Sequence, residues 1–91
     1  MIVNIKTFEI NDDNEVEEIS SDFKHEDKEY QSEIDFKEII DICNSDRIVG
    51  FEYEYLDDVG WSPTKEDDSG AVADILVNYE QYKELEIRIY F

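Results

Sequence analysis

Carboxylates are the reactive side chains that this sequence holds in greatest number. Asp and Glu account for 26 of the 91 residues, against 8 Lys and Arg residues and one His. Paired carboxylates can serve as acid and base in glycoside hydrolysis, but in so acidic a chain such pairs arise by chance. A domain this small also lacks room for a deep substrate cleft. We therefore expect that the protein is not an enzyme and has no catalytic residue.

The single histidine and the single cysteine add no catalytic or metal-binding motif. His25 lies in the polar stretch FKHEDKEY, where we expect it to be exposed. Cys43 falls on the apolar stripe of a predicted helix, where a cysteine is typically a small core residue. One Cys and one His cannot complete a zinc site, and the acidic runs lack the spacing of a calcium-binding loop. We therefore expect neither a metal site nor a cofactor.

The stretch FEYEYLDD, which begins at Phe51, has the most regular spacing of acidic residues. Its three aromatic residues alternate with Glu52 and Glu54, which predicts a strand with one face in the core and an acidic face in water. The two carboxylates would then lie about 7 Å apart, two residues along a strand, a spacing of the same order as that of phosphates along DNA. Such a ladder can imitate a row of phosphates, although glutamate on the wet face of a strand is also ordinary.

Two regions hold nearly all of the net charge of −18. Residues 9–35 contain twelve acidic residues and two lysines, and residues 52–68 contain seven acidic residues and one lysine. Solubility calls for a net charge of only about 2–8 on a small domain, and a larger charge repels itself in the folded state. Adaptation to high salt is another explanation, but the acidic residues here are clustered. The clustering therefore predicts a partner with a basic surface.

The residues expected to contact that partner form two patches. The first patch, within residues 52–68, comprises Glu52, Glu54, Asp57, Asp58, Glu66, Asp67 and Asp68. The second patch comprises Asp12, Asp13, Glu15, Glu17 and Glu18. Trp61, in the loop VGWSPTK, is either an apolar anchor of the interface or a cap on the core, because aromatic residues supply much of the binding energy of interfaces.

The hydrophobic pattern predicts the elements that position these residues. Strands are expected at residues 2–10, 47–56 and 85–91, with a bulge near Lys6 and Thr7, a turn at residues 11–14 and a close backbone approach or bulge at Gly50. The clearest helix lies within residues 32–46, with Ser32 as its N-cap. Residues 15–23 fit a returning strand or a helix, and residues 71–84 a helix or, at 72–77, a strand. Residues 24–33 are expected to be a loop or a hairpin extension.

Together these elements predict one domain, residues 1–91, of the α+β class. We expect a sheet of three or four strands, mainly antiparallel, with one or two helices on one face. No signal peptide or apolar stretch of about 20 residues is present, and a single cysteine allows no intramolecular disulfide. These features favour a cytoplasmic location, in a bacterial host if the gene belongs to a phage.

In size and charge the chain resembles the small acidic proteins of phages and mobile elements that occupy nucleic-acid-binding sites, such as antirestriction and anti-CRISPR inhibitors. It is also similar in these respects to immunity proteins that neutralise nuclease toxins. The resemblance is one of composition, without signature residues, and implies a DNA mimic that binds a nuclease or another nucleic-acid-binding protein. An acidic adaptor subunit of a larger complex is the third alternative. Direct contact with nucleic acid or membranes is not expected, because both are anionic.

Overall fold

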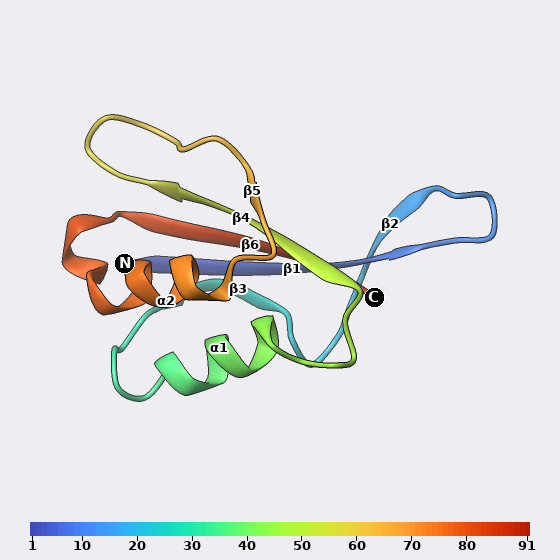
Figure 1. Cartoon of the computed structure of the whole chain (residues 1–91), viewed down its shortest axis with the longest axis horizontal. Coiled ribbons are helices and arrows are strands. Elements are labelled where there is room, and N and C mark those ends of the chain that lie inside the picture. The colour runs from blue at the N-terminus through green and yellow to red at the C-terminus, as the bar shows by residue number, and fades with distance from the viewer.

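The structure, a computed structural model, describes residues 1–91 and consists of a six-stranded sheet with two helices on one of its faces (Figure 1). The elements are β1 (Ile2–Ile10), β2 (Val16–Ile19), β3 (His25–Glu29), α1 (Phe36–Cys43), β4 (Gly50–Leu56), β5 (Lys65–Glu66), α2 (Ser69–Val77), a 3-10 turn η1 (Tyr79–Gln81) and β6 (Glu84–Tyr90). The predicted α+β class is therefore confirmed. Neither helix has the length or the apolar composition that crossing a bilayer requires.

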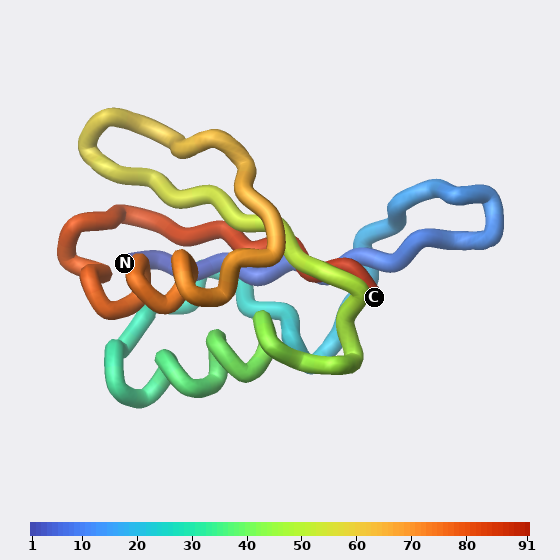
Figure 2. Tube along the Cα trace, viewed as in Figure 1, coloured from blue at the N-terminus to red at the C-terminus, as the bar shows by residue number.

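The sheet is mixed, in the order β2-β1-β6-β4-β5, and β3 pairs with the same side of β1 as β2 does. The two central strands β1 and β6 are parallel, and the other pairs are antiparallel. The prediction of three or four strands, mainly antiparallel, was therefore wrong. The parallel pair arises because the chain leaves the β5 edge, crosses one face of the sheet as α2 and returns between β1 and β4 (Figure 2).

Two strands were missed because their sequences do not alternate between apolar and polar residues. β5 has only two residues, and β3 has the sequence HEDKE, which we had expected to be a loop or a hairpin extension. The backbone of β3 pairs with the first half of β1. Two of its side chains, His25 and Lys28, face α1, where Lys28 Nζ lies 3.0 Å from Oδ1 of Asp35 and 3.1 Å from Oε2 of Glu38. A polar strand is stable here because ion pairs fix its position.

The expected bulge near Lys6 and Thr7 is absent, and this prediction was wrong. β1 runs without interruption, and Thr7 is fully buried on the same face as Val3 and Ile5. Its hydroxyl donates a hydrogen bond to the carbonyl of Ile19 at 2.7 Å, so a polar residue takes a core position without an unsatisfied group. The irregularity lies opposite residue 4, where the register between β1 and β3 shifts.

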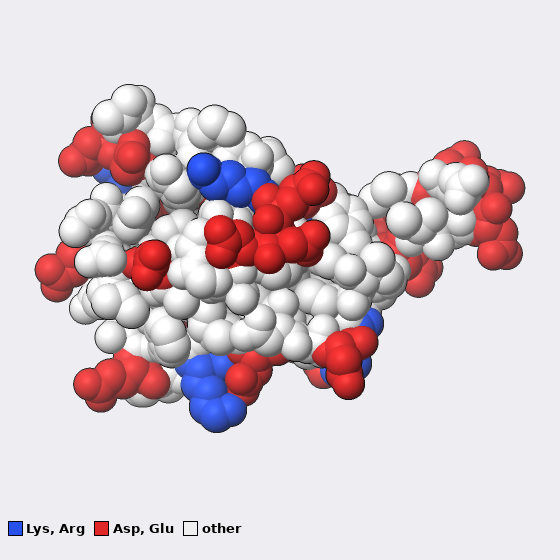
Figure 3. All heavy atoms as spheres, in the orientation of Figure 1, with Lys and Arg blue, Asp and Glu red and all other residues white.

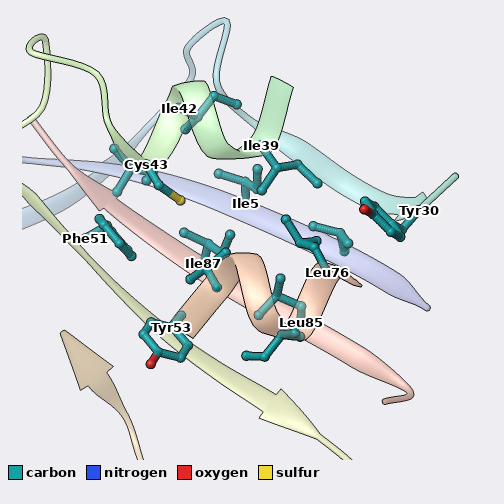
Figure 4. Packing of buried hydrophobic residues seen from close by; sticks show 14 residues of the cluster. Ile5, Tyr30, Ile39, Ile42, Cys43, Phe51, Tyr53, Leu76, Leu85 and Ile87 are labelled. Atoms are coloured by element: carbon teal, nitrogen blue, oxygen red, sulfur yellow. The ribbon is translucent and has the colours of Figure 1, made fainter. Parts of the chain in front are cut away.

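The core lies between the sheet and the two helices (Figure 4). Alternate residues of the three long strands point into it, among them Ile5, Leu85, Ile87, Phe51 and Tyr53. The helices cover them with Ile39, Ile42 and Cys43 from α1 and with Val72, Ile75 and Leu76 from α2. Burial raises the pKa of the Cys43 thiol to about 12, as befits a cysteine that serves as a core residue.

An aspartate occupies the N-cap position of each helix, and for α1 this differs from the expected Ser32. Ser32 is not the N-cap of α1, because its φ of 51° places it in a turn that precedes the helix. Asp35 occupies the N-cap position, and its carboxylate accepts a hydrogen bond from the N–H of Gln31 at 2.7 Å. For residues 71–84 the helix prediction is confirmed: α2 begins at Ser69, and Asp68 caps it by accepting from the N–H of Ala71 at 2.9 Å.

Candidate partner-binding surface

The acidic ladder of β4 lies on the sheet face opposite the helices. Phe51 and Tyr53 are buried against the helices, so Glu52 and Glu54 point the other way, as predicted. In the sheet register Glu52 is beside Arg88, and Glu54 is beside Glu86. We call this uncovered surface of the sheet the open face.

Arg88 neutralises much of that ladder. Its Nη1 donates a hydrogen bond to Oε1 of Glu54 at 2.7 Å, and its Nη2 lies 3.6 Å from Oε2 of Glu52. Partial burial disfavours the charged guanidinium, but the hydrogen bond with Glu54 and the charges of Glu52 and Glu86 outweigh it and raise the pKa of Arg88. Lys6 Nζ lies 3.1 Å from Oε1 of Glu86. The ladder is thus part of an ion network, and its contribution to partner binding stays a prediction.

Three aspartates of the first patch hold local structure. Asp57 accepts hydrogen bonds from the N–H groups of Val59 and Gly60, at 2.9 and 3.2 Å, and so closes the turn after β4. Asp68 caps α2, as described above. Asp67, at a φ of 51°, accepts from the N–H of Phe51 at 2.9 Å and extends the pairing of β4 with β5. Their carboxylates are therefore needed for folding whether or not a partner contacts them.

Gly50 is required by this role of Asp67. A Cβ atom at residue 50 would lie 2.9 Å from Oδ1 of Asp67, closer than carbon and oxygen normally approach. At this glycine we expect a bulge or a close backbone approach, and the structure shows the close approach of a side chain instead. The group that approaches is a carboxylate and not another strand.

The other members of the first patch are more exposed. Asp58 is 3.5 Å from Nζ of Lys83 and almost fully exposed, and Glu66 lies exposed on β5 opposite Glu52. Trp61 pairs with Leu56 in an isolated bridge, is 48% exposed and lies outside the buried cluster. Trp61 therefore does not cap the core, and its role as an interface anchor stays a prediction.

The second patch forms a hairpin of β1 and β2 that projects from the body of the molecule (Figure 1). Its turn follows the prediction for residues 11–14: the side-chain oxygen of Asn11 accepts from the N–H groups of Asp13 and Glu15, both at 2.9 Å, and Asn14 has a φ of 60°. No helix packs against this hairpin. The hairpin extends the long axis of the molecule, which measures 41 Å (Figure 2).

The hairpin carries unbalanced negative charge. Residues 9–18 include six acidic residues and no basic residue. None of the six forms an ion pair, since the ion pairs of the molecule join lysines, arginines, His25 and the N-terminus to other carboxylates. Glu9 and Glu17 lie directly opposite each other in the register, and like charges in this arrangement are destabilising.

The part of the first patch formed by Asp57 and Asp58 is not continuous with the hairpin, whereas Glu52, Glu66 and Asp67 line a groove together with Ile10, near the base of the hairpin. The hairpin leaves the sheet at the end where β1 finishes, whereas Asp57 and Asp58 follow β4 at the end where β1 begins. The tip of the hairpin and the turn after β4 therefore lie at opposite ends of the molecule (Figure 1). On the face shown in Figure 3, acidic atoms lie on the hairpin and in the region of β5 and α2, where basic atoms adjoin them, and further separate acidic groups lie around the rest of the outline, with uncharged atoms between the groups.

Sequence reasoning missed several residues that shape this surface. Arg88 was read only as part of the closing strand, although its alternation with apolar residues places it on the open face beside β4. His25 is not exposed as expected: its side chain is 15% exposed, and Nε2 lies 3.2 Å from Oε1 of Glu38. The spacing of Asp35 and Glu38 predicts that they share a helix face, but His25 and Lys28 are three residues apart and face α1 together only because the register of β3 shifts between them. No three side chains converge in a way that would ligate a metal ion.

Comparisons with known proteins identify no relative: no family model matches the chain, and no curated protein or solved structure is significantly similar to it.

Proposed function

We propose that the protein is a non-catalytic inhibitor that binds the basic nucleic-acid-binding surface of a DNA- or RNA-handling protein and acts as a DNA mimic. The observation that carries the proposal is the projecting β1–β2 hairpin, whose six acidic residues have no basic partner within the chain. Unpaired carboxylates on a projecting element are available to arginines and lysines of another molecule.

The geometry of a hairpin suits this role. Glu9 and Glu17 face each other across the two strands, which lie about 4.8 Å apart, and Glu18 points to the other face. Asp12, Asp13 and Glu15 lie at the turn. The hairpin therefore concentrates negative charge at the end of a narrow body, which can enter a groove that accommodates nucleic acid. Charge-assisted hydrogen bonds to carboxylates are among the stronger protein contacts. Opposite net charges also accelerate association at low salt.

The test compares two variants with the same change in net charge. In the hairpin variant, Asp12, Asp13, Glu15 and Glu18 are changed to Lys. In the control variant, the exposed residues Glu33, Asp46, Asp74 and Glu80 are changed to Lys. Proteins captured from bacterial lysate on immobilised wild type at about 50 mM salt, and lost at about 200 mM, are purified and tested for binding to duplex DNA and RNA.

We expect the captured protein to bind nucleic acid. Added nucleic acid should release the captured protein from the immobilised wild type. The hairpin variant should lose most of its affinity for that protein and the control variant should retain it. Retention of full affinity by the hairpin variant, or binding that nucleic acid does not affect, would refute the proposal.

Two alternatives have a different partner. An immunity protein would bind one nuclease toxin tightly and leave unrelated nucleic-acid-binding proteins unaffected. An acidic adaptor subunit would link two basic proteins, and the placement of acidic patches at both ends of the molecule is the observation that favours it. In that case the hairpin variant would lose one partner and retain the other, whereas the control variant would retain both.

A further inference from the structure

A groove at the base of the hairpin differs from the acidic surface around it. This base groove has a volume of about 320 Å³ and is lined by Ile10, Val49, Gly50, Tyr90 and the carboxylate-bearing residues Glu52, Glu66 and Asp67, together with Phe51. We infer that the base groove receives an apolar or aromatic side chain of the basic partner, flanked in that partner by arginine or lysine. The inference rests on the proposed function and deepens it.

The pairing of the strands explains why apolar residues gather there. Ile10 is opposite Val16, and Phe8 is beside Tyr90 with its ring stacked at a centroid distance of 5.5 Å. Phe8 and Tyr90 are on the open face, because their neighbours Thr7 and Ile89 are buried on the other face, and Ile10 and Val16 follow the same alternation. Val49 also lines the groove, and its backbone N–H donates a hydrogen bond to the carbonyl of Tyr90 at 2.7 Å.

These apolar side chains have no cover within the chain. Ile10 is 55% exposed, Val16 is 56% exposed and Val49 is 80% exposed. Single exposed apolar residues are normal on protein surfaces, but a group of them with an aromatic floor is typical of a binding site. Gly50 leaves room beside Tyr90 because it has no side chain, and the adjoining Asp67 carboxylate keeps that position a glycine.

The charges around the base groove define its occupant. Three carboxylate-bearing residues line the groove and no lysine or arginine does. Nucleic acid would be repelled, and a second copy of this chain would bring another net charge of −18. A protein segment with an apolar side chain between basic residues complements both the apolar floor and the acidic rim. Interfaces commonly have this anatomy, with an apolar centre inside a polar rim.

The test uses two synthetic peptides of equal length and charge, one alternating arginine with tryptophan and the other alternating arginine with serine. Each is titrated into isotope-labelled protein at low salt, and amide chemical shifts are followed by NMR. We expect the arginine–tryptophan peptide to bind about tenfold more tightly and to shift the amides of Ile10, Val49, Gly50 and Tyr90. The arginine–serine peptide should shift mainly the amides of residues 11–18.

Val49→Ser provides the matching variant, with Val59→Ser as its control. Both valines are largely exposed, at 80% and 97%, so neither change threatens folding, and residue 59 lies in the turn after β4 at the other end of the molecule. Val49→Ser should weaken binding of the arginine–tryptophan peptide about threefold to tenfold, without affecting the arginine–serine peptide. Val59→Ser should change neither affinity.

The outcomes separate the inference from the proposed function. If both peptides bind with equal affinity and shift only the hairpin amides, the inference is wrong and the proposed function stands. If neither peptide binds to the carboxylates at low salt, both are wrong. A shift of the base-groove amides that depends on tryptophan and on Val49 supports both. Self-association, detected as a mass of two chains by sedimentation, would show that a second copy occupies the groove and would overturn the inference.

Discussion

At the scale of single residues, the carboxylates of this protein divide into those held by neighbouring groups and those left free. Asp35, Asp57, Asp67 and Asp68 accept backbone hydrogen bonds and fix turns or helix starts. The carboxylates at the tip of the hairpin have no such partners apart from Glu17, which accepts from the side chain of Asn11 at 3.2 Å. The sequence alone does not distinguish the acidic residues that accept structural hydrogen bonds from those that are free, and the structure does.

Asp35→Asn should destabilise the protein by about 1–3 kcal/mol at neutral pH, because Lys28 would lose a buried charged partner. Burial alone would raise the pKa of Asp35, but the hydrogen bond from Gln31 and the contact with Lys28 outweigh it and lower that pKa. The stabilisation by the ionised carboxylate is therefore complete above the unfolded-state pKa of about 3.9. It is lost as the pH falls through the folded-state pKa.

The measurement for Asp35 is urea unfolding of wild type and variant from neutral pH down to the acid transition. The difference in free energy of unfolding between the two proteins should stay constant down to about pH 4 and shrink below it. A difference that grows on acidification would show that the Asp35 carboxylate does not have the contacts described here.

Gly50→Ala should destabilise the protein by about 1–2 kcal/mol, because the new methyl group displaces the Asp67 carboxylate and leaves the N–H of Phe51 without its acceptor. Asp67→Ala removes the same hydrogen bond, so the double variant should be scarcely less stable than either single variant. Thermal unfolding of the four proteins measures this coupling. Strictly additive losses would contradict it.

At the scale of elements, the sequence predicted the helices and strands that have a regular pattern of apolar residues. The helix α1 and the three long strands were predicted, because Ile39 in α1 and Ile87 in β6 belong to regular apolar patterns. The helix α2 was one of two alternatives, because residues 72–77 also fitted a strand. β3 was not predicted, because its polar sequence is stabilised by ion pairs rather than by apolar contacts. β5 was not predicted, because it has only two residues and is defined by its backbone pairing with β4. The order and register of the strands could not be predicted either, because nothing in the local sequence indicates that β6 lies between β1 and β4. This position of β6 places Arg88 against Glu52 and Glu54.

The candidate site was predictable in part. The acidity of residues 9–18 and the turn at residues 11–14 were readable from the sequence. The hairpin was only one of two alternatives, because residues 15–23 fitted a returning strand or a helix. The base groove was not predicted, because Ile10 and Val49 are 39 residues apart. Their proximity depends on the pairing of Val49 with Tyr90 and of Phe8 with Tyr90.

The hairpin itself carries strain from like charges, and relieving it should stabilise the fold. Glu9→Lys places a lysine directly opposite Glu17 and should raise the free energy of unfolding by about 0.5 kcal/mol. The same change should weaken binding to a basic partner. Chemical unfolding and a binding assay on one preparation measure both effects. A variant that is less stable than wild type would show that the two glutamates do not repel each other in the folded state.

At the scale of the whole molecule, the net charge of −18 is a cost to the folded state. Six of the eight lysines and arginines pair with carboxylates on the body of the molecule, and the hairpin receives none of them. The protein therefore combines a body that is stabilised by ion pairs and a buried core with a projecting element on which repulsion is not relieved.

Added salt should stabilise the free protein, because screening weakens repulsion over distances beyond about 10 Å at 0.1 M salt. The midpoint of thermal unfolding should rise by several degrees between low salt and about 0.5 M sodium chloride. Each kcal/mol added to the free energy of unfolding raises the midpoint by about 4–8 °C in a domain of this size. Scanning calorimetry checks this, with the hairpin variant expected to respond less. A falling midpoint would show that ion pairs outweigh repulsion.

The most direct test of the central claim is the salt dependence of binding between the protein and a purified captured partner. The dissociation constant is measured at several salt concentrations for wild type, the hairpin variant and the control variant of equal charge. The account predicts a steep loss of affinity with salt for wild type and control, and a much shallower dependence for the hairpin variant. Equal salt dependence in all three proteins would contradict it, because net charge rather than the hairpin would then govern recognition.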